Sequence, residues 1–264
     1  MRRPPDWLIY LLIVFMIYLN ATRSSDGTDA PPPPPELGPI LPAETPRDQA
    51  VIVDMNVPKS GVGTAFAVDD SGKWITAKHV VDGCEAIGLQ LDSRRIVRAE
   101  ATVSPDTDLA VLTTEWARKP LATDIDGPRQ LGEAGYFFGF PQGRPGEASG
   151  TLLGRHRMII RGRYKSEEAI LAWTETGRTR GLRGSLGGMS GGPAFDADGE
   201  VVGVVSAESP RRGRIYTVAP RSLRSILKTN NGVTGSAISK QNYGLQADRL
   251  RRDRRIAQVI CIVN

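Results

Sequence analysis

The sequence has few of the residues from which metal and cofactor sites are usually built. Its 264 residues include only two histidines and two cysteines, and aromatic residues make up 6%. Cys84 and Cys261 are too few for a disulfide scaffold and lack the spacing of a zinc site, so we expect no metal and no cofactor. In an oxidising compartment the two cysteines can pair and tie the end of the chain to the domain. Two independent buried thiols are the alternative.

Long hydrophobic runs are also scarce, with a single one at residues 7–19. As a helix this run spans roughly 20 Å, less than the roughly 30 Å of a bilayer's hydrocarbon core. An uncleaved signal anchor is favoured, because Leu19 makes a poor cleavage signal before Ala21; a removed signal peptide is the alternative. Arg2 and Arg3 precede the run, so in both cases the remainder of the chain should be exported.

Positive charge is in modest excess, with a net charge of +5. It gathers in one place only, at Arg249, Arg251, Arg252, Arg254 and Arg255. No nucleic-acid-binding motif accompanies these arginines, so we expect a solvated basic segment and no nucleic-acid partner. Contact with anionic lipid is a weaker alternative.

The sequence patterns divide the chain into four segments. Residues 1–22 are the anchor or signal peptide, and residues 23–48 are a linker that contains the polyproline run 31–35. Residues 49–230 alternate short β-like runs with glycine- and proline-rich turns, which favours an all-β barrel or sandwich. The runs cover residues 63–68, 73–77, 95–103, 109–113, 135–140, 169–174, 201–206 and 215–218, with a helix over 221–228. Residues 231–264 are predicted to form a short basic tail.

The scarcity of histidine restricts the general base for any serine nucleophile to His79 or His156. His156 lies between Arg155 and Arg157, whose positive charge would oppose protonation of its ring. His79 follows the β-like run 73–77, at the point where a new element begins. Because an isolated histidine is more often structural than catalytic, His79 needs support from other residues.

The most informative pattern is the run GGMSGGP at residues 187–193, with Ser190 at its centre. Glycines on both sides of a nucleophile permit a sharp turn and the close approach of a substrate. They also let the backbone N–H groups of Gly188 and Ser190 converge on one point, as an oxyanion hole requires. A glycine-rich loop with an incidental serine is the alternative, but it does not explain the histidine and the acid upstream.

An acid that can orient the histidine occurs in the run SPDTDLAVL, residues 104–112. A carboxylate at the start of an apolar strand can be buried against a histidine, where it fixes the tautomer and stabilises the imidazolium. Asp108 adjoins the apolar run and is preferred, whereas Asp106 is expected in the preceding turn.

In this order, His79, Asp108 and Ser190 resemble the catalytic residues of the trypsin- and chymotrypsin-like serine proteases. The sequence is most similar to the bacterial high-temperature-requirement (HtrA-like) branch. The resemblance rests on GVGTAF at 61–66, ITAKHVV at 75–81, TDLAVL at 107–112, GFPQG at 139–143 and GMSGGP at 188–193. It covers about residues 50–228.

The resemblance implies an all-β fold of two antiparallel six-stranded barrels, with the first carrying His79 and Asp108 and the second Ser190. It implies a serine endopeptidase that acts on peptides or unfolded proteins; a catalytically silent binding or sensor domain is the alternative. A substrate backbone would pair along residues 204–208. The expected substrate-binding residues are Ser206, Ala207, Glu208 and Arg214.

Several positions depart from the family pattern. Met189 stands where Asn or Asp is common, Lys78 directly precedes His79, and Glu208 and Arg214 stand where small residues are common. The last two either narrow the specificity pocket, give it a charge preference or, as we expect, pair with each other.

The resemblance also bears on the chain's surroundings. The PDZ domain that often follows this protease domain is not expected, because residues 231–264 are too few for it. With the run 7–19, the bacterial branch implies a single-pass inner-membrane protein whose protease domain lies in the periplasm. Secretion after signal cleavage is the alternative, and the oligomeric state is left open.

Overall fold

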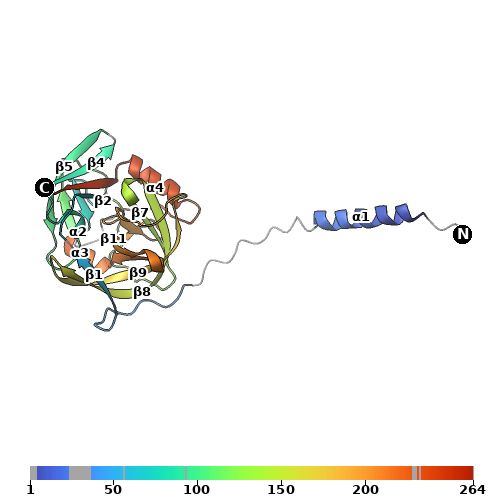
Figure 1. The fold of residues 1–264 in the computed structure, drawn as a ribbon, viewed down its shortest axis with the longest axis horizontal. Helices are drawn as coiled ribbons and strands as arrows, with labels where there is room; N and C mark the ends of the chain where they lie inside the picture. Colours follow the sequence, from blue (N-terminus) through green and yellow to red (C-terminus); the bar gives the residue numbers. More distant parts are fainter. Residues whose placement is uncertain are drawn as a thin grey trace. The chain divides into compact units, whose positions relative to one another are not determined.

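The structure is a computed structural model that describes residues 5–23, 37–55, 57–92, 94–227, 231 and 233–263. The chain divides into two units, Met1–Glu36 and Leu37–Asn264 (Figure 1). In the first unit, helix α1 spans Asp6–Arg23, where the sequence predicts an anchor. No helix within the described residues is both long and apolar enough to cross a membrane, so the predicted anchor is not confirmed. The polyproline run 31–35 lies outside the described residues.

Six strands of the second unit close into an antiparallel barrel. They are β2 (Gly61–Ala67), β3 (Lys73–Thr76), β4 (Ala86–Asp92), β5 (Arg95–Val103), β6 (Ala110–Thr113) and β13 (Ile256–Ile262). Their order around the barrel is β13-β2-β3-β6-β5-β4. Ala65, Trp74, Leu89, Leu112 and Val259 are buried together inside it, because alternate residues of a strand share a face.

The last strand of this barrel comes from the segment predicted as a basic tail. β13 pairs with β2 on one side and with β4 on the other. Helix α4 (Tyr243–Arg252) precedes it and buries Ala247. α4 and β13 are therefore part of the fold rather than of a tail, because the apolar run of β13 covers two strand edges that would otherwise be open.

The other half of the unit is a seven-stranded sheet; no second closed barrel is found within the described residues, although the sequence predicts one. Its strands are β1 (Gln49–Met55), β7 (Ala134–Gly139), β8 (Gly146–Gly162), β9 (Ser166–Arg178), β10 (Pro193–Phe195), β11 (Val201–Ser209) and β12 (Arg214–Val218). The order is β1-β8-β7-β10-β11-β12-β9, and β8 also pairs with β9. The long β8 pairs with β7 along its first part and in parallel with β1 from His156 to Gly162. β1 thus adds a parallel seventh strand to the six antiparallel ones.

Short helices follow strands of both halves (Figure 1), and a shared core joins the halves. Helix α2 (Lys78–Val81) follows β3, and α3 (Pro220–Leu227) follows β12 where the sequence predicts a helix. Two 3₁₀ turns, Pro141–Gly143 and Pro210–Arg212, follow β7 and β11. The core combines Phe66 of the barrel with Phe138 and Phe195 of the sheet, whose ring centres are 5.0 Å apart. Burial of these rings holds the halves against each other.

A disulfide bond joins Cys84, in the loop before β4, to Cys261 of β13. The two Cα atoms are 5.4 Å apart, and the sequence separation is 177 residues. We predict that replacing both cysteines with serine lowers the free energy of unfolding by about 2–4 kcal/mol, because a cross-link over a long loop restricts the unfolded chain. Denaturant unfolding of the oxidised wild type and the double variant measures the difference. Equal free energies of unfolding would contradict the prediction.

Candidate active site

His79 lies in α2, shortly after β3 ends at Thr76. The backbone N–H of Lys78 donates to the carbonyl oxygen of Asp108 at 3.1 Å. The backbone N–H of His79 donates to Asp108 Oδ1 at 3.0 Å. These two bonds align the start of α2 with the loop that leads into β6.

The ring of His79 and the carboxylate of Asp108 form the central contact of the site. His79 Nδ1 lies 2.8 Å from Asp108 Oδ2. Asp108 is fully buried and also accepts hydrogen bonds from the hydroxyl groups of Ser206 and, at 3.3 Å, Tyr164. Asp106 is exposed in the preceding turn, as the sequence predicts. The structure thus brings His79 and Asp108 together.

Burial and charge oppose each other in setting the pKa values of this pair. Burial alone would lower the pKa of His79, but the negative charge of Asp108 and its hydrogen bond raise that pKa above the usual value. Burial alone would raise the pKa of Asp108, but the His79 charge and the hydrogen bonds from His79 and Ser206 lower it. The pair therefore keeps the carboxylate ionised and favours the imidazolium, the state that a general base must reach.

Ser190 lies in a loop whose backbone requires glycine. Gly188 and Gly191 have φ angles of 97° and 83°, a region that residues with side chains rarely adopt. A Cβ atom on Gly188 would lie 2.5 Å from the carbonyl oxygen of Phe140. One on Gly191 would lie 2.2 Å from that of Thr64. Both the conformation and the space therefore exclude larger residues.

Thr64 of β2 connects the barrel to this loop. Its N–H donates to the carbonyl oxygen of Ser190, and its hydroxyl donates to that of Gly188, both at 2.8 Å. The same hydroxyl accepts the N–H of Phe140 at 3.1 Å. Thr64 is fully buried, so these bonds are shielded from water. They fix the main chain at Ser190 relative to the barrel that carries His79.

The expected oxyanion donors, the N–H groups of Gly188 and Ser190, have no acceptor among the described residues. The carbonyl oxygen of Gly187 accepts the N–H of Gln142 at 2.6 Å, and that of Gly188 accepts the Thr64 hydroxyl. The two N–H groups are thus available for an anion.

In this described part of the chain no hydrogen bond joins Ser190 Oγ to the His79 ring. Such bonds are often long until substrate binds.

Two side chains anchor the segment that leads to Ser190, and the sequence did not point to either in this role. Gln142 Nε2 donates to the carbonyl oxygens of Arg183 and Ser185 at 2.7 and 2.9 Å. The Glu208 carboxylate accepts the N–H of Leu186 at 2.9 Å and the hydroxyl of Ser185. Their partners are mostly backbone groups, which leave no sequence signal. The GFPQG motif, which contains Gln142, was the available hint.

The four expected substrate-binding residues have different surroundings. Ser206 directs its hydroxyl to Asp108, while Arg214 donates to Thr174 Oγ1 at 3.0 Å. No ion pair joins Glu208 to Arg214 in the described ranges, so the prediction that they pair is wrong. Glu208 binds the loop before Ser190 instead, because that loop offers unpaired N–H and hydroxyl donors.

The strand that carries three of these residues has one open side near the site. β10 pairs with β11 only as far as Val204. At Ala207 and Glu208, β11 pairs with β12 alone. Within the described residues β11 thus presents one strand edge without a partner strand here, the kind of edge with which an extended peptide pairs.

His156 lies apart from this group, on β8. Its Nδ1 atom is buried without a hydrogen-bond partner in the described structure. Burial lowers the pKa of its ring, which disfavours the protonated form. His79 is therefore the histidine that the fold pairs with an acid.

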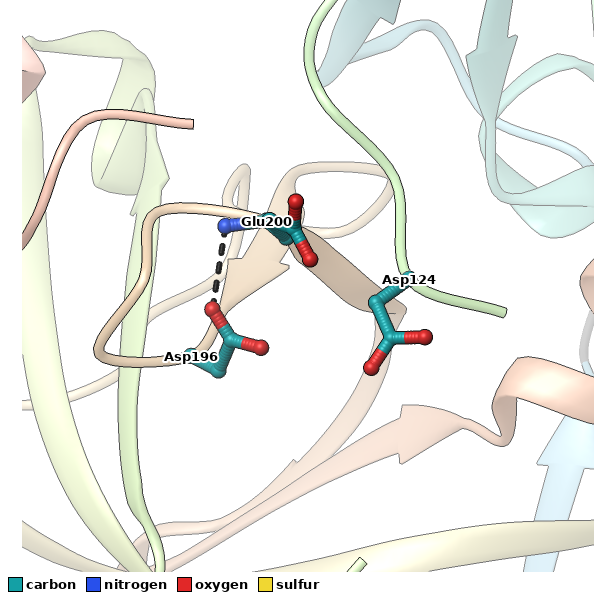
Figure 2. Close-up of side chains that lie close together, drawn as sticks. All are labelled: Asp124, Asp196 and Glu200. Carbon is teal, nitrogen blue, oxygen red and sulfur yellow. Dashed lines mark hydrogen bonds between the residues drawn. The ribbon is translucent and has the colours of Figure 1, made fainter. Parts of the chain in front are cut away.

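A separate group of acids has a cationic side chain at its centre. Figure 2 shows Asp124, Asp196 and Glu200, which each place a carboxylate oxygen within 4.8 Å of the others. The N–H of Glu200 donates to Asp196 Oδ1 at 3.0 Å. The guanidinium of Arg129 lies 2.5 Å from Asp124 Oδ2 and 3.4 Å from Asp196 Oδ2. Because Arg129 supplies the compensating charge, we assign this group to the stability of the turn before β11.

Known proteins share both sequence and fold with this chain. Residues 63–204 match the family model described as "Trypsin-like peptidase domain". A "Probable periplasmic serine endoprotease DegP-like" of Marinomonas sp. is 29% identical over 163 residues, which are 61% of this chain and 33% of the relative. A protein of the same description from Brucella suis is 31% identical over 159 residues, 58% of this chain and 29% of the relative. The chain spans about a third of the length of these curated relatives.

Two solved structures illustrate the similarity of fold. The active form of the Rv3671c protease from M. tuberculosis gives a TM-score of 0.52 at 16% identity, covering 80% of this chain and 100% of that one. The HtrA-type protease AlgW with a decapeptide gives 0.50 at 23% identity, covering 63% and 50%. At these identities the likeness concerns the fold alone. Because the family match spans more than half of the sequence, the chain belongs to the family of trypsin-like peptidase domains.

Proposed function

We propose that this protein is a serine endopeptidase in which Ser190 is the nucleophile, His79 transfers protons and Asp108 orients His79. The observation that carries the proposal is the buried contact of 2.8 Å between His79 Nδ1 and Asp108 Oδ2. With Nδ1 directed at the carboxylate, Nε2 is the ring atom left to accept a proton. Membership of the trypsin-like family and the DegP-like relatives support the same reaction.

The reaction proceeds in two halves. In the first, His79 Nε2 takes the Ser190 hydroxyl proton as Oγ bonds to the scissile carbonyl carbon. The carbonyl oxygen becomes an oxyanion, to which the N–H groups of Gly188 and Ser190 donate. The imidazolium gives its proton to the leaving amine, and an acyl group stays on Ser190. In the second half, His79 activates water in the same way, and the acid product leaves with Ser190 restored.

Peptides and unfolded proteins are the substrates that suit this site. An extended segment would pair with β11 at Ala207 and Glu208, where the strand has one open side. The DegP-like relatives are themselves described as endoproteases.

An extracytoplasmic location fits the chemistry of the chain. Disulfides such as Cys84–Cys261 persist in oxidising compartments that include the bacterial periplasm. The curated relatives are described as periplasmic. Attachment to the membrane through residues 7–19 stays a prediction from the sequence, as does the alternative of secretion after signal cleavage.

The proposal predicts that Ser190→Ala abolishes both peptide cleavage and labelling by a fluorophosphonate probe. Loss of the nucleophile should lower kcat by roughly four to six orders of magnitude. Cleavage of an unfolded protein by the purified full chain measures the first effect, and in-gel fluorescence the second. Ser225→Ala on α3, whose hydroxyl donates to Ser222, is the matched control. A folded wild type that neither cleaves nor reacts would favour the catalytically silent binding domain.

The pH profile of kcat/KM should report the His79–Asp108 pair. Because the pKa of His79 is raised, the acidic limb of the profile should have its midpoint above 6.5, the ordinary pKa of histidine. Asp108→Asn removes the charge that raises this pKa, so the acidic limb should move to lower pH. The maximal rate should fall about 10⁴-fold, because the ring loses its orientation. An unmoved limb would contradict the assignment of His79 to this titration.

Glu208 should affect the rate through the loop that it anchors. Glu208→Ala leaves the N–H of Leu186 without its acceptor, and we expect kcat to fall roughly 10- to 100-fold as the loop shifts. Glu208→Gln keeps an acceptor oxygen, so its kcat should fall less than that of Glu208→Ala. Glu167→Ala removes an exposed carboxylate of β9 that pairs with Arg157 and serves as control. Full activity in Glu208→Ala would show that the loop holds its shape without this carboxylate.

A further inference from the structure

The hairpin of β8 and β9 reaches from the seven-stranded sheet to the barrel, next to Asp108. At its turn, Arg163 Nε lies 3.2 Å from Asp82 Oδ2, and the Tyr164 hydroxyl donates to Asp108 Oδ1 at 3.3 Å. The ammonium group of Lys78 lies 4.3 Å from the centre of the Tyr164 ring, a cation–π distance. The hairpin is thus fastened to the segment of α2 as well as to Asp108.

A second residue of the hairpin contacts the main chain of Asp108. Glu168 of β9 is 6% exposed, and its Oε1 accepts the backbone N–H of Asp108 at 2.6 Å. Within the described residues it forms no ion pair; the ammonium group of Lys78 donates to the carbonyl oxygen of Ser104 instead, at 2.8 Å. A buried carboxyl group without a salt bridge is costly, so its role has to be sought in the one strong bond that it makes.

We propose that Glu168 is a positioning residue of the active site, which holds the main chain of Asp108 so that its carboxylate meets His79. Asp108 is then fixed on both sides of its backbone, because its carbonyl oxygen accepts the N–H of Lys78 at 3.1 Å. Glu168 also accepts the buried N–H group of Asp108, which would be costly to leave without a hydrogen bond. It acts through Asp108 and touches no reacting atom. The catalytic part of this proposal rests on the proposed function.

The surroundings of Glu168 favour its neutral form. Burial raises its pKa to about 8, and the charge of Asp108 adds to this effect. The N–H of Asp108, the Ser222 hydroxyl and the charge of Lys78 act in the opposite direction. The Ser222 hydroxyl lowers the pKa of Glu168 without forming a well-aligned hydrogen bond, because Glu168 Oε2 has no hydrogen-bond partner among the described residues. A cavity of about 310 Å³ beside Glu168 is lined by further charged or titratable groups, namely Glu44, Asp48, His156, Arg157 and Glu167.

This environment links Glu168 to the pH dependence of stability. Its pKa rises from 4.5, the value for an unperturbed glutamate, to about 8 in the fold. Between these values the folded chain binds a proton that the unfolded chain has released. The stabilisation is therefore fully present below pH 4.5 and is lost as the pH rises to about 8. Glu168→Gln keeps an acceptor oxygen but cannot ionise, so it should flatten this part of the profile.

Three substitutions in the full, oxidised chain separate positioning from a merely structural role. Glu168→Ala removes the oxygen that accepts the N–H of Asp108. Glu168→Asp shortens the side chain by one methylene, so the oxygen no longer reaches that N–H, and Glu168→Gln keeps an acceptor oxygen in place. We expect kcat to fall roughly 10- to 100-fold in the Ala and Asp variants with little change in KM, and Gln to restore most of the loss. The exposed neighbour Glu167, which pairs with Arg157, supplies the control Glu167→Gln, expected to match wild type.

Two further readouts do not depend on catalysis. The proton on His79 Nδ1, observed by NMR as a downfield signal, should persist in Glu168→Gln and shift or exchange rapidly in Glu168→Asp. The free energy of unfolding between pH 5 and 8 should depend less on pH in Glu168→Gln than in wild type, whereas Glu167→Gln should match wild type; the raised pKa of His79 supplies the dependence that remains.

The outcomes distinguish this proposal from the proposed function. An unchanged kcat and an unchanged Nδ1 signal in a folded Glu168→Asp or Glu168→Ala would overturn the positioning role. If Glu168→Ala does not fold, the Asp and Gln variants decide the matter by the same two measurements. A wild type that shows the Nδ1 signal and its dependence on Glu168, but neither cleaves nor labels, would overturn the proposed function and leave the positioning role supported.

Discussion

The hydrogen bonds of Thr64 are the constraint on which the proposed site depends. The two halves of the fold supply the groups that we propose to react, and an error of an ångström between such groups can cost about 100-fold in rate. Thr64 donates to the carbonyl oxygens of Gly188 and Ser190 on one side. On the other side its own carbonyl oxygen accepts the hydroxyl of Thr76, where β3 ends before His79, at 2.7 Å. One buried residue thus sets the distance from the nucleophile loop to the segment that carries the base.

Local patterns predicted that Asp108 is buried against His79 and located several of the short strands, but they did not predict the pairings between distant segments. The expected runs at 63–68, 73–77 and 201–206 correspond to β2, β3 and β11. The apolar run of β13 looked like the end of a tail, because its partners β2 and β4 lie far away in the sequence. The resemblance places Glu208 among the substrate-binding residues, but its contact with the N–H of Leu186 was not predicted, because a backbone group has no side-chain signature. Motifs carry the chemistry of single residues, whereas the supporting contacts form only after the chain has folded.

Two buried carboxyl groups within one hydrogen-bond chain illustrate how surroundings determine the charge of an acid. Asp108 has the His79 ring and the Ser206 hydroxyl against its oxygens, and their charge and hydrogen bonds offset burial and lower its pKa. Glu168 receives the N–H of Asp108, and burial together with the Asp108 charge raises its pKa to about 8. A neutral Glu168 can accept that N–H without placing a second negative charge beside the first. The separation of the two pKa values therefore lets the acids occupy neighbouring positions.

Both ends of the folded unit support this arrangement. β13 pairs with β2, the strand of Thr64, and β1 pairs with the part of β8 that leads to the hairpin turn at Tyr164. The distance between the Ser190 loop and His79 thus depends on strands that lie far from both residues in the sequence. The position of Asp108 depends on them as well. Pairings between such distant segments carry the largest loop-closure cost during folding. A chain with a partly formed barrel and sheet would hold the motifs without their geometry, so the complete site depends on the complete fold.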